Sequence, residues 1–520
     1  PPPRNESLAM RRVASADQVT PLVRPDAKEN YSRSLRDPAG QSPLSGSRSR
    51  ASFSSLGGAP IEAPKDEENR FDFKGIFILC VNTMNGPGLL ALPKAFAECG
   101  LVPGMIAMIT CAWITTATSQ ILSDAVLLTR QKTQDYDAAY EFTDLARIHF
   151  GPTMETVTVI MLCLTLGALA IAQITIVAQA LDAMIITFYG QSYALRYYPR
   201  MEMVSSETLS LQPFGVNQMM VSLGFVVAMA ICIILGMMDL TANKLPQYIS
   251  FVLLAVSAVA LFAHITPLAS EQMLHNSNTT GLASFLGDDP ASIVGVAVFN
   301  FSIVIAIPSL LVDSKTGVDF IGAVSLSLII ICLLYVSVGW IGASGYGDAN
   351  DNLMAPMLEA DNLLAKVACF SFVWALVPPL PIYTILISRN LEQVMGQPKL
   401  AKILGVFVPW TLSMFLYMSE AFGAFVVWTS ILVLGFTNYT LPLAIAAKAC
   451  SGSPAKKDHG RGGCCRQMWD GILSAWSDEV GRKALVVNFI ITAVLVVVVI
   501  MNVQKALGAR SFEEAVDEAL

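Results

Sequence analysis

Two stretches of the chain place helix-breaking and polar residues inside long apolar runs. The first reads NTMNGPGLLALP over residues 82–93, and the second reads VFNFSIVIAIPSLL over residues 298–311. Proline removes a backbone donor and clashes with the preceding turn, and each glycine costs roughly 1 kcal/mol relative to alanine in a helix interior. Backbone groups that lose their helical hydrogen bonds within the membrane are tolerated only where they line a polar cavity or contact a ligand. We therefore expect broken helices around a binding cavity, with a simple packing kink as the alternative.

Such a cavity suits a zwitterionic ligand. No Asp, Glu, Lys or Arg lies at the centre of an apolar run, so a strongly charged ligand would lack a counter-charge. Amides that begin a half-helix at Gly88 offer about half a positive charge to a carboxylate, and carbonyls freed near Thr83 and Asn300 can accept from an ammonium group. The expected substrate-binding residues are Asn82, Thr83, Asn85, Gly86, Gly88, Leu89, Phe299, Asn300, Phe301, Ser302 and Ile305. The phenylalanines and the isoleucine among them would either form an apolar pocket for the substrate side chain or pack against neighbouring helices.

The composition is that of a multi-span membrane protein. The 520 residues are 54% hydrophobic and 14% charged, against about 25% charged residues in an ordinary soluble domain. Only His264 of the four histidines lies in an apolar run, so we expect no catalytic residues, no metal site and no cofactor beyond a coupling ion. The expected partners are a small substrate and the lipid bilayer, with no nucleic acid. The oligomeric state stays open.

Charge-free runs of about 20 residues can cross the hydrocarbon core as helices. Eleven such runs are predicted, with the pair around Glu420 the least sharply defined. They cover approximately residues 75–97, 101–123, 156–184, 215–238, 247–270, 291–312, 320–342, 364–388, 402–419, 422–447 and 484–503. The sequence thus predicts an all-α membrane protein with eleven transmembrane helices.

The lysines and arginines predict which way the spans lie. With the N terminus in the cytosol, inner segments carry 27 of these residues and outer segments carry four, so the N terminus is expected inside and the C terminus outside. Within this topology the expected parts are a disordered cytosolic tail, a core of ten helices, a basic cytosolic loop, an eleventh helix and an outer tail. They cover residues 1–70, 71–447, 448–483, 484–503 and 504–520.

The two breaks also predict an internal repeat. They lie in the first and sixth runs, five helices apart, which is the spacing of an inverted repeat of five plus five helices with one helix added. No residue-level identity between the halves supports the repeat. Gln173, Thr175 and Gln179 of the third run could face the cavity, although hydrogen bonding between helices is the commoner use of such residues.

At these residues the chain resembles the amino acid/auxin permease (AAAP) family. The family pattern N-x-x-x-G-x-x-L-L-x-L-P-x-A is met from Asn82 to Ala95, and the segments 140–151, 335–348 and 438–445 are similar to further parts of the family. The resemblance covers about residues 71–503. It implies a LeuT-type fold with eleven helices and secondary transport of amino acids, driven by protons or sodium.

The coupling ion is the least defined part of this interpretation. Family members that use sodium usually supply hydroxyl oxygens from span eight, because a hard cation prefers several oxygen ligands. The corresponding stretch here, ALVPPLPI over Ala375–Ile382, has none, and Ser371 and Thr384 lie outside it. Proton coupling is therefore favoured over sodium, with His264 as the candidate proton carrier or else as a neutral, hydrogen-bonded histidine.

We therefore predict a secondary active transporter of neutral amino acids that works by alternating access. The alternatives are a sodium-coupled amino acid transporter and a non-transporting amino acid sensor that signals through its tail. The membrane is expected to be the plasma membrane or a vacuolar or lysosomal membrane.

Overall fold

The computed structural model describes residues 70–450 with several gaps, all within the unit Ala63–Leu520. The gaps are residue 87 and residues 136–138, 211, 216–217, 276–284, 288, 291, 347–352, 361 and 418–428. The predicted tail up to residue 69, the loop 451–483, the eleventh helix 484–503 and the outer tail 504–520 lie outside the described residues.

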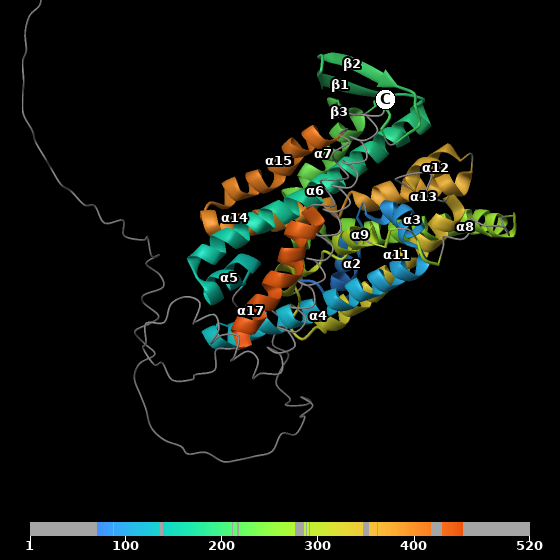
Figure 1. The fold of residues 1–520 in the computed structure, drawn as a ribbon. Coiled ribbons are helices and arrows are strands. Elements are labelled where there is room, and N and C mark those ends of the chain that lie inside the picture. Colours follow the sequence, from blue (N-terminus) through green and yellow to red (C-terminus); the bar gives the residue numbers. More distant parts are fainter. Residues whose placement is uncertain are drawn as a thin grey trace, which may run out of the picture. The chain divides into compact units, whose positions relative to one another are not determined.

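Helices form nearly all of the described chain (Figure 1). In chain order they are α2 (Phe73–Met84), α3 (Gly88–Cys99), α4 (Leu101–Thr133), α5 (Phe142–Phe150), α6 (Pro152–Tyr189), α7 (Leu223–Gly236), α8 (Lys244–His275), α9 (Ser292–Asn300), α10 (Ile307–Val312), α11 (Phe320–Tyr346), α12 (Met354–Glu359), α13 (Leu363–Leu376), α14 (Leu380–Met395), α15 (Pro398–Leu416) and α17 (Leu441–Cys450). Short 3₁₀ segments are η2 (Leu240–Asn243) and η3 (Val304–Ala306), and π-helical segments are η4 (Thr429–Leu434) and η5 (Phe436–Thr440).

Several of these helices are long and apolar enough to cross a membrane. Within the described ranges six segments meet that requirement, and seven do so if the bent pair α2 and α3 counts as one span. The helix α7 has only 14 residues and falls short by length. The chain is therefore a multi-span helical membrane protein.

A three-stranded antiparallel sheet interrupts this helical pattern, and the all-α prediction was wrong in this respect. The strands β1 (Ser192–Tyr198), β2 (Glu202–Ser206) and β3 (Met219–Ser222) lie in the order β2-β1-β3. Within β1 buried and exposed residues alternate at its start, which is the period of a strand with one covered face. The predicted span 215–238 overran β3, and its helix begins only at Leu223.

A buried carboxylate joins this sheet to the helices. Asp182, near the end of α6, is fully buried and accepts hydrogen bonds from Ser192 Oγ (2.7 Å), from the Gly224 backbone N–H (2.8 Å) and from the Tyr417 hydroxyl. Ser222 caps α7 by accepting from the Phe225 N–H at 3.1 Å. Because a buried charge is costly unless it is hydrogen-bonded, this network ties β1 and α7 to α6.

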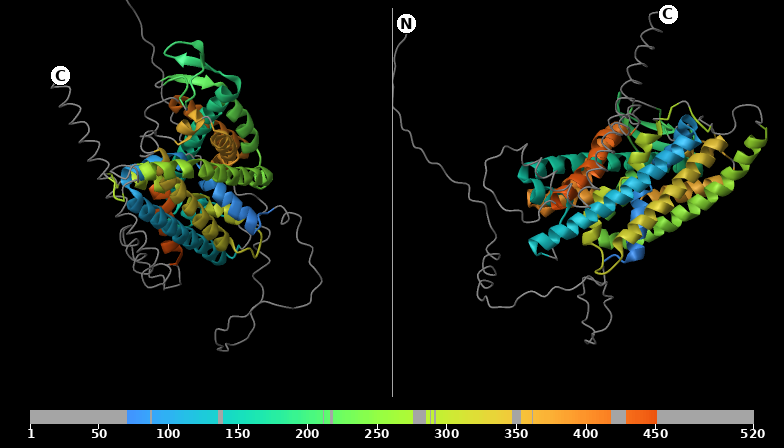
Figure 2. Two further views of the ribbon diagram at one scale, coloured as in Figure 1. Left: turned by 90° about the vertical axis from the view of Figure 1, so that its right-hand side faces the viewer. Right: turned by 60° about the horizontal axis from the view of Figure 1, so that its bottom comes forward.

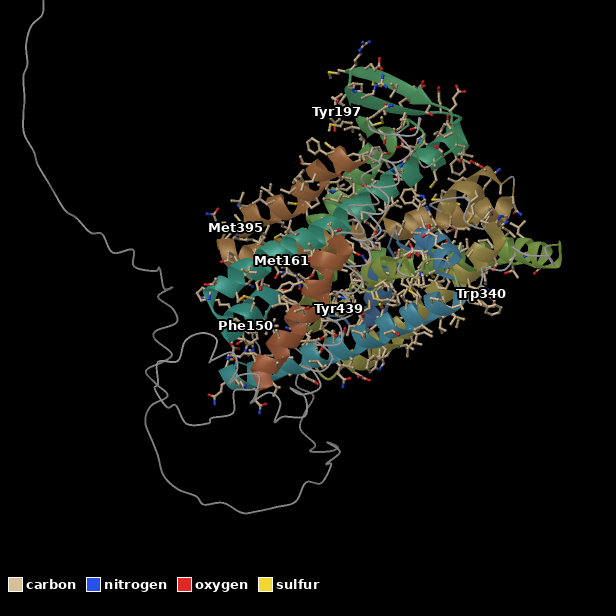
Figure 3. All side chains as sticks on the ribbon, in the orientation of Figure 1. Phe150, Met161, Tyr197, Trp340, Met395 and Tyr439 are labelled. Atoms are coloured by element: carbon tan, nitrogen blue, oxygen red, sulfur yellow. The ribbon has the colours of Figure 1, made fainter. Side chains whose placement is uncertain are left out.

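Small residues bring the helices close to the first broken span. The ring of Phe96 on α3 packs between Gly104 on α4 and Gly339 on α11, where a Cβ would lie 2.7 Å and 2.4 Å from ring atoms. Close approach at small residues is typical of helix packing in membranes. Figure 2 shows α4, α8 and α11 running alongside one another, and side chains fill the space between the ribbons in Figure 3.

Candidate substrate site at two broken helices

The first span is broken where the sequence predicts. The helix α2 ends at Met84, α3 begins at Gly88, and the two are bent by 58°. In a continuous helix the carbonyl of Thr83 would accept a hydrogen bond from the backbone N–H of residue 87. Residue 87 is proline, which has no N–H to donate. In the structure the Tyr383 hydroxyl donates to this carbonyl at 2.7 Å, and the Tyr335 hydroxyl donates to the carbonyl of Met84. Two phenols from other helices thus replace helical amides.

The sixth span is also broken. The helix α9 ends at Asn300, and the short segment η3 precedes α10. Asn438 on η5 bridges the gap: its Nδ2 donates to the carbonyl of Phe301 at 3.0 Å, and its Oδ1 accepts from the Val304 N–H at 3.0 Å. One buried side chain therefore satisfies a carbonyl and an amide of the broken backbone. The neighbouring Tyr439, labelled in Figure 3, bonds with Thr115 on α4 at 3.0 Å.

A cavity of about 210 Å³, including the space at its mouth, lies between the two breaks. No charged side chain among the described residues lines it. Its lining comes from α2, the first break, α6, α9, the second break and α14. The residues are Thr83, Met84, Gly86, Leu169, Gln173, Phe299, Asn300, Ser302 and Tyr383.

Unpaired polar atoms point to a polar ligand in this cavity. Both side-chain polar atoms of Asn300 are buried without a partner among the described residues, as is Oε1 of Gln173. The other amide atom of Gln173 donates to the carbonyl of Leu376 at 2.9 Å, which fixes its orientation. A buried polar group without a hydrogen bond costs about 1–3 kcal/mol, so these atoms favour a ligand that supplies the missing partners.

Gly88 lets the two breaks approach each other. A Cβ built there would lie 2.0 Å from Asn300 Oδ1, far closer than atoms can approach without a shift. Gly88 does not line the cavity. It is needed because Asn300 occupies the space that any side chain at residue 88 would take.

The structure brings together five of the predicted binding residues. Thr83, Gly86, Phe299, Asn300 and Ser302 line the cavity. The remaining predicted residues lie nearby without lining it; they are Asn82, Asn85, Gly88, Leu89, Phe301 and Ile305.

Three of those outside the cavity have other neighbours. Asn82 Nδ2 donates to the carbonyl and side chain of Gln247 on α8, at 2.8 and 2.9 Å. The ring of Phe301 packs edge-on against Tyr335, with ring centroids 5.5 Å apart. Leu89 lines a different, apolar cavity.

Sequence reasoning missed three lining residues, Met84, Leu169 and Tyr383. Tyr383 directly follows the stretch Ala375–Ile382, which has no hydroxyl group, so its phenol lies one residue beyond that stretch. Of the third-span residues, Gln173 lines the cavity, whereas Gln179 donates to the carbonyl of Tyr417 at 2.8 Å.

His264 lies apart from this cavity. Its Nε2 is 2.8 Å from the Tyr346 hydroxyl, so the pair connects α8 with the end of α11. Both residues lie at the ends of these helices that the predicted topology would place towards the outside.

A charged cluster lies at the end of α10. Arg389 on α14 pairs with Asp313 at 2.8 Å and lies 3.9 Å from Glu141, which also accepts from the Ser309 hydroxyl. Burial raises the pKa of the Glu141 carboxyl, although Arg389 and Ser309 lower it in part.

The backbone that leads into α2 is held beside this cluster. The Phe71 N–H donates to the carbonyl of Asp313 at 2.8 Å, and the Lys315 N–H donates to the carbonyl of Phe71 at 2.9 Å. The two strands of chain form a short parallel bridge. The start of the first span is thus fastened to the end of the sixth.

Comparison with known proteins agrees with this architecture. Residues 73–501 match the family described as transmembrane amino acid transporter protein. No curated protein matches the chain.

Two solved transporters have a similar fold. Mhp1, a nucleobase-cation-symport-1 family transporter in a closed conformation with bromovinylhydantoin bound, has a TM-score of 0.56 at 12% identity, covering 85% of this chain and 94% of Mhp1. MhsT in complex with L-phenylalanine has a TM-score of 0.53 at 12% identity, covering 82% of this chain and 97% of MhsT. Both have LeuT-like folds.

The family match spans most of the chain, including both broken helices and the cavity between them. The protein therefore belongs to the transmembrane amino acid transporter family, the AAAP family, and is a membrane transporter rather than an enzyme.

Proposed function

We propose that the protein is a secondary active transporter of neutral amino acids that works by alternating access. The observation that carries this proposal is the cavity between the breaks, where unpaired atoms of Asn300 and Gln173 face a lining without charged residues. A zwitterion brings its own two charges, so it needs dipoles rather than counter-ions. The likeness to MhsT, solved with L-phenylalanine, supports an amino acid as the substrate.

The substrate would lie with its carboxylate towards the start of α3 and its ammonium group towards the freed carbonyls. A helix N-terminus favours an anion through its free amides and dipole. The carbonyls of Thr83 and Met84 each accept one phenol and keep a second lone pair for an ammonium group. Phe299 and Leu169 would then contact the side chain.

We further propose eleven spans in a five-plus-five inverted repeat with one added helix, and a cytosolic N terminus. The distribution of 27 inner and four outer basic residues supports this orientation. The membrane is the plasma membrane or a vacuolar or lysosomal one.

Uptake into vesicles containing the purified protein tests the proposed function. We expect neutral amino acids to compete for uptake of a labelled neutral one, and lysine and glutamate to compete poorly. Each amino acid is measured with and without a pH gradient, and with and without sodium. A pH requirement supports proton coupling and a sodium requirement favours the alternative ion. Binding without flux would identify a sensor instead.

His264 is the proposed proton carrier. If its imidazole carries the coupled proton, His264→Gln abolishes uptake driven by a pH gradient and leaves amino acid exchange intact, because Gln cannot titrate. Tyr346→Phe, which removes the hydroxyl bonded to His264, is the matched variant and should shift the pH dependence without abolishing uptake. Unchanged gradient-driven uptake in His264→Gln would assign the residue a packing role only.

We propose that the charged cluster holds the cytosolic side closed. Arg389→Gln leaves buried Glu141 and half-buried Asp313 without this arginine. It should weaken closure by about 2 kcal/mol, or roughly thirtyfold in the closed population, a value between those for exposed and fully buried ion pairs. The measurement is hydrogen exchange at the Phe71 and Lys315 amides, which bond across the two segments. Arg147→Gln, at a pair whose arginine is 63% exposed, is the control and should leave exchange unchanged.

The same closure is expected to depend on pH. Because the pKa of buried Glu141 is raised, the closed cluster binds a proton more readily than a solvated carboxyl does. Closure is therefore favoured at low pH and weakened as pH rises through the raised pKa. Exchange at Phe71, corrected for its intrinsic rate, should rise as the pH increases beyond the ordinary range of a carboxyl pKa, and Glu141→Gln should flatten this rise. Protection that grows with pH would contradict the assignment.

A further inference from the structure

A second cavity lies on the side of α3 that faces α8, α11 and α13. It measures about 430 Å³, including the space at its mouth, and is larger than the cavity between the breaks. Leu89 and Leu90 contribute the first turn of α3, and Met357 comes from α12. The helices that surround it pack together in Figure 1. Neither the substrate site nor the charged cluster uses this space.

The lining of this cavity offers a polar ligand no charged side chain and a single hydroxyl group. The lining hydroxyl, from Ser257 on α8, already donates to the carbonyl of Ala368 at 2.9 Å. Aliphatic side chains, Phe372 and two sulfur-bearing types complete the described lining, with no charged residue among them. An amino acid, a headgroup or an ion bound here would lose its hydration without replacement. The ligand must therefore be apolar.

The mouth of the cavity lies at the lipid-facing surface. Ala258 on α8 and Leu334 on α11 are half-buried, and the other lining residues are buried. Their neighbours Val259 and Leu333 are 71% and 64% exposed. Since these exposed apolar residues lie on membrane-spanning helices, the hydrocarbon of the bilayer borders the mouth.

We propose that this cavity binds one acyl chain of a bilayer phospholipid, which enters beside Ala258 and Leu334. The headgroup would stay in the interfacial region, because the cavity offers it no partner. The chain would contact Leu89 and Leu90, in the first turn of the half-helix that follows the first break. The carbonyl of Leu90 also accepts from the Leu353 N–H at 3.1 Å, so the same turn is joined to the segment that begins α12. Bound lipid would thus stabilise the position of α3.

Photolabelling with phosphatidylcholine that carries a diazirine in one acyl chain tests the proposal on the full-length protein in nanodiscs. The helix α13 supplies an internal control: Cys369 and Phe372 line the cavity, whereas Val367 and Phe370 are 36% and 41% exposed. We expect label on all four residues, because an acyl chain reaches both the cavity and the outer surface. Label confined to Val367 and Phe370 would overturn the proposal.

A variant whose side chain fills the mouth distinguishes labelling inside the cavity from labelling at the lipid-facing surface. Ala258→Trp should lower labelling of Cys369 and Phe372 at least fivefold and leave labelling of Phe370 unchanged. Val259→Trp, one residue away and lipid-facing, should change neither. If the Trp variant does not fold, Ala258→Leu gives a smaller reduction of the same kind. Equal labelling of Cys369 in wild type and in both mouth variants would exclude this route of entry.

Competition identifies the occupant. Excess unlabelled phosphatidylcholine should displace the label from Cys369, and excess cholesterol should not. Displacement by cholesterol alone would assign the cavity to a sterol and overturn the proposal. Because labelling requires neither substrate nor flux, its failure is distinct from a failure of the proposed transport function.

Discussion

Gly88→Ala is expected to reduce amino acid uptake roughly a hundredfold, since forcing a methyl group into a tightly packed site costs up to about 3 kcal/mol. The added Cβ would lie 2.0 Å from Asn300 Oδ1, 2.7 Å from Cγ and 2.9 Å from Nδ2. Asn300 must therefore move, and its two unpaired atoms would leave the positions they hold in the cavity. The measurement is initial uptake of a labelled neutral amino acid, together with its apparent binding constant.

Gly167→Ala provides the matched control for this variant. Gly167 also lies in a long apolar helix, α6, but a Cβ built there meets nothing within 4 Å. Alanine has the higher helix propensity, so this change should leave uptake at the wild-type level and stability equal or higher. Wild-type uptake by Gly88→Ala would mean that the space beside Asn300 is not part of the substrate site.

The positions of the two breaks could be predicted because their causes are local. Proline at residue 87 has no backbone N–H to donate to the carbonyl of Thr83, and the flanking glycines weaken the helix further. The helix ends at Met84 and restarts at Gly88 accordingly. The side chains that hydrogen-bond to the freed backbone groups could not be predicted in the same way. Tyr383 and Asn438 lie 300 and 137 residues from the carbonyls they bond, and only the packed fold brings them there.

Helix geometry explains which of the predicted site residues line the cavity. Adjacent positions on a helix point about 100° apart, so a helix presents only some of its residues to one small space. Thr83 lines the cavity, and its neighbour Asn82 turns to Gln247 on α8. In the sixth span Phe299 lines the cavity, and Phe301 packs on Tyr335. The sequence indicated two stretches that border the cavity, but the face of each helix that lines it depends on where the neighbouring helices lie.

The sheet was missed for a different reason. Spans were identified as charge-free runs, and β3 at Met219–Ser222 continues without a charge into α7. Nothing in hydropathy marks the change from strand to helix. A sharper signal is Ser222, a residue type that favours the position before a helix, and in the structure it caps α7.

Asn438→Ala is expected to abolish uptake and to destabilise the protein by about 4 kcal/mol, since each buried backbone group left without a partner costs about 1–3 kcal/mol. The substitution removes both bonds across the second break, to the Phe301 carbonyl and from the Val304 N–H. No other described residue bonds these two groups across the gap. The measurements are thermal unfolding in detergent and vesicle uptake of a labelled amino acid.

Two variants make this expectation specific. Asn438→Asp keeps the oxygen that accepts from the Val304 N–H and loses the donor to the Phe301 carbonyl, so its stability should fall between those of wild type and Asn438→Ala. Asn390 on α14 is equally buried, but its amide donates within its own helix, to the carbonyl of Leu386 at 2.9 Å. Asn390→Ala should therefore leave uptake near the wild-type level. Equal losses in Asn390→Ala and Asn438→Ala would indicate that any buried amide matters here, and that the bridge across the sixth span has no special role in holding the site.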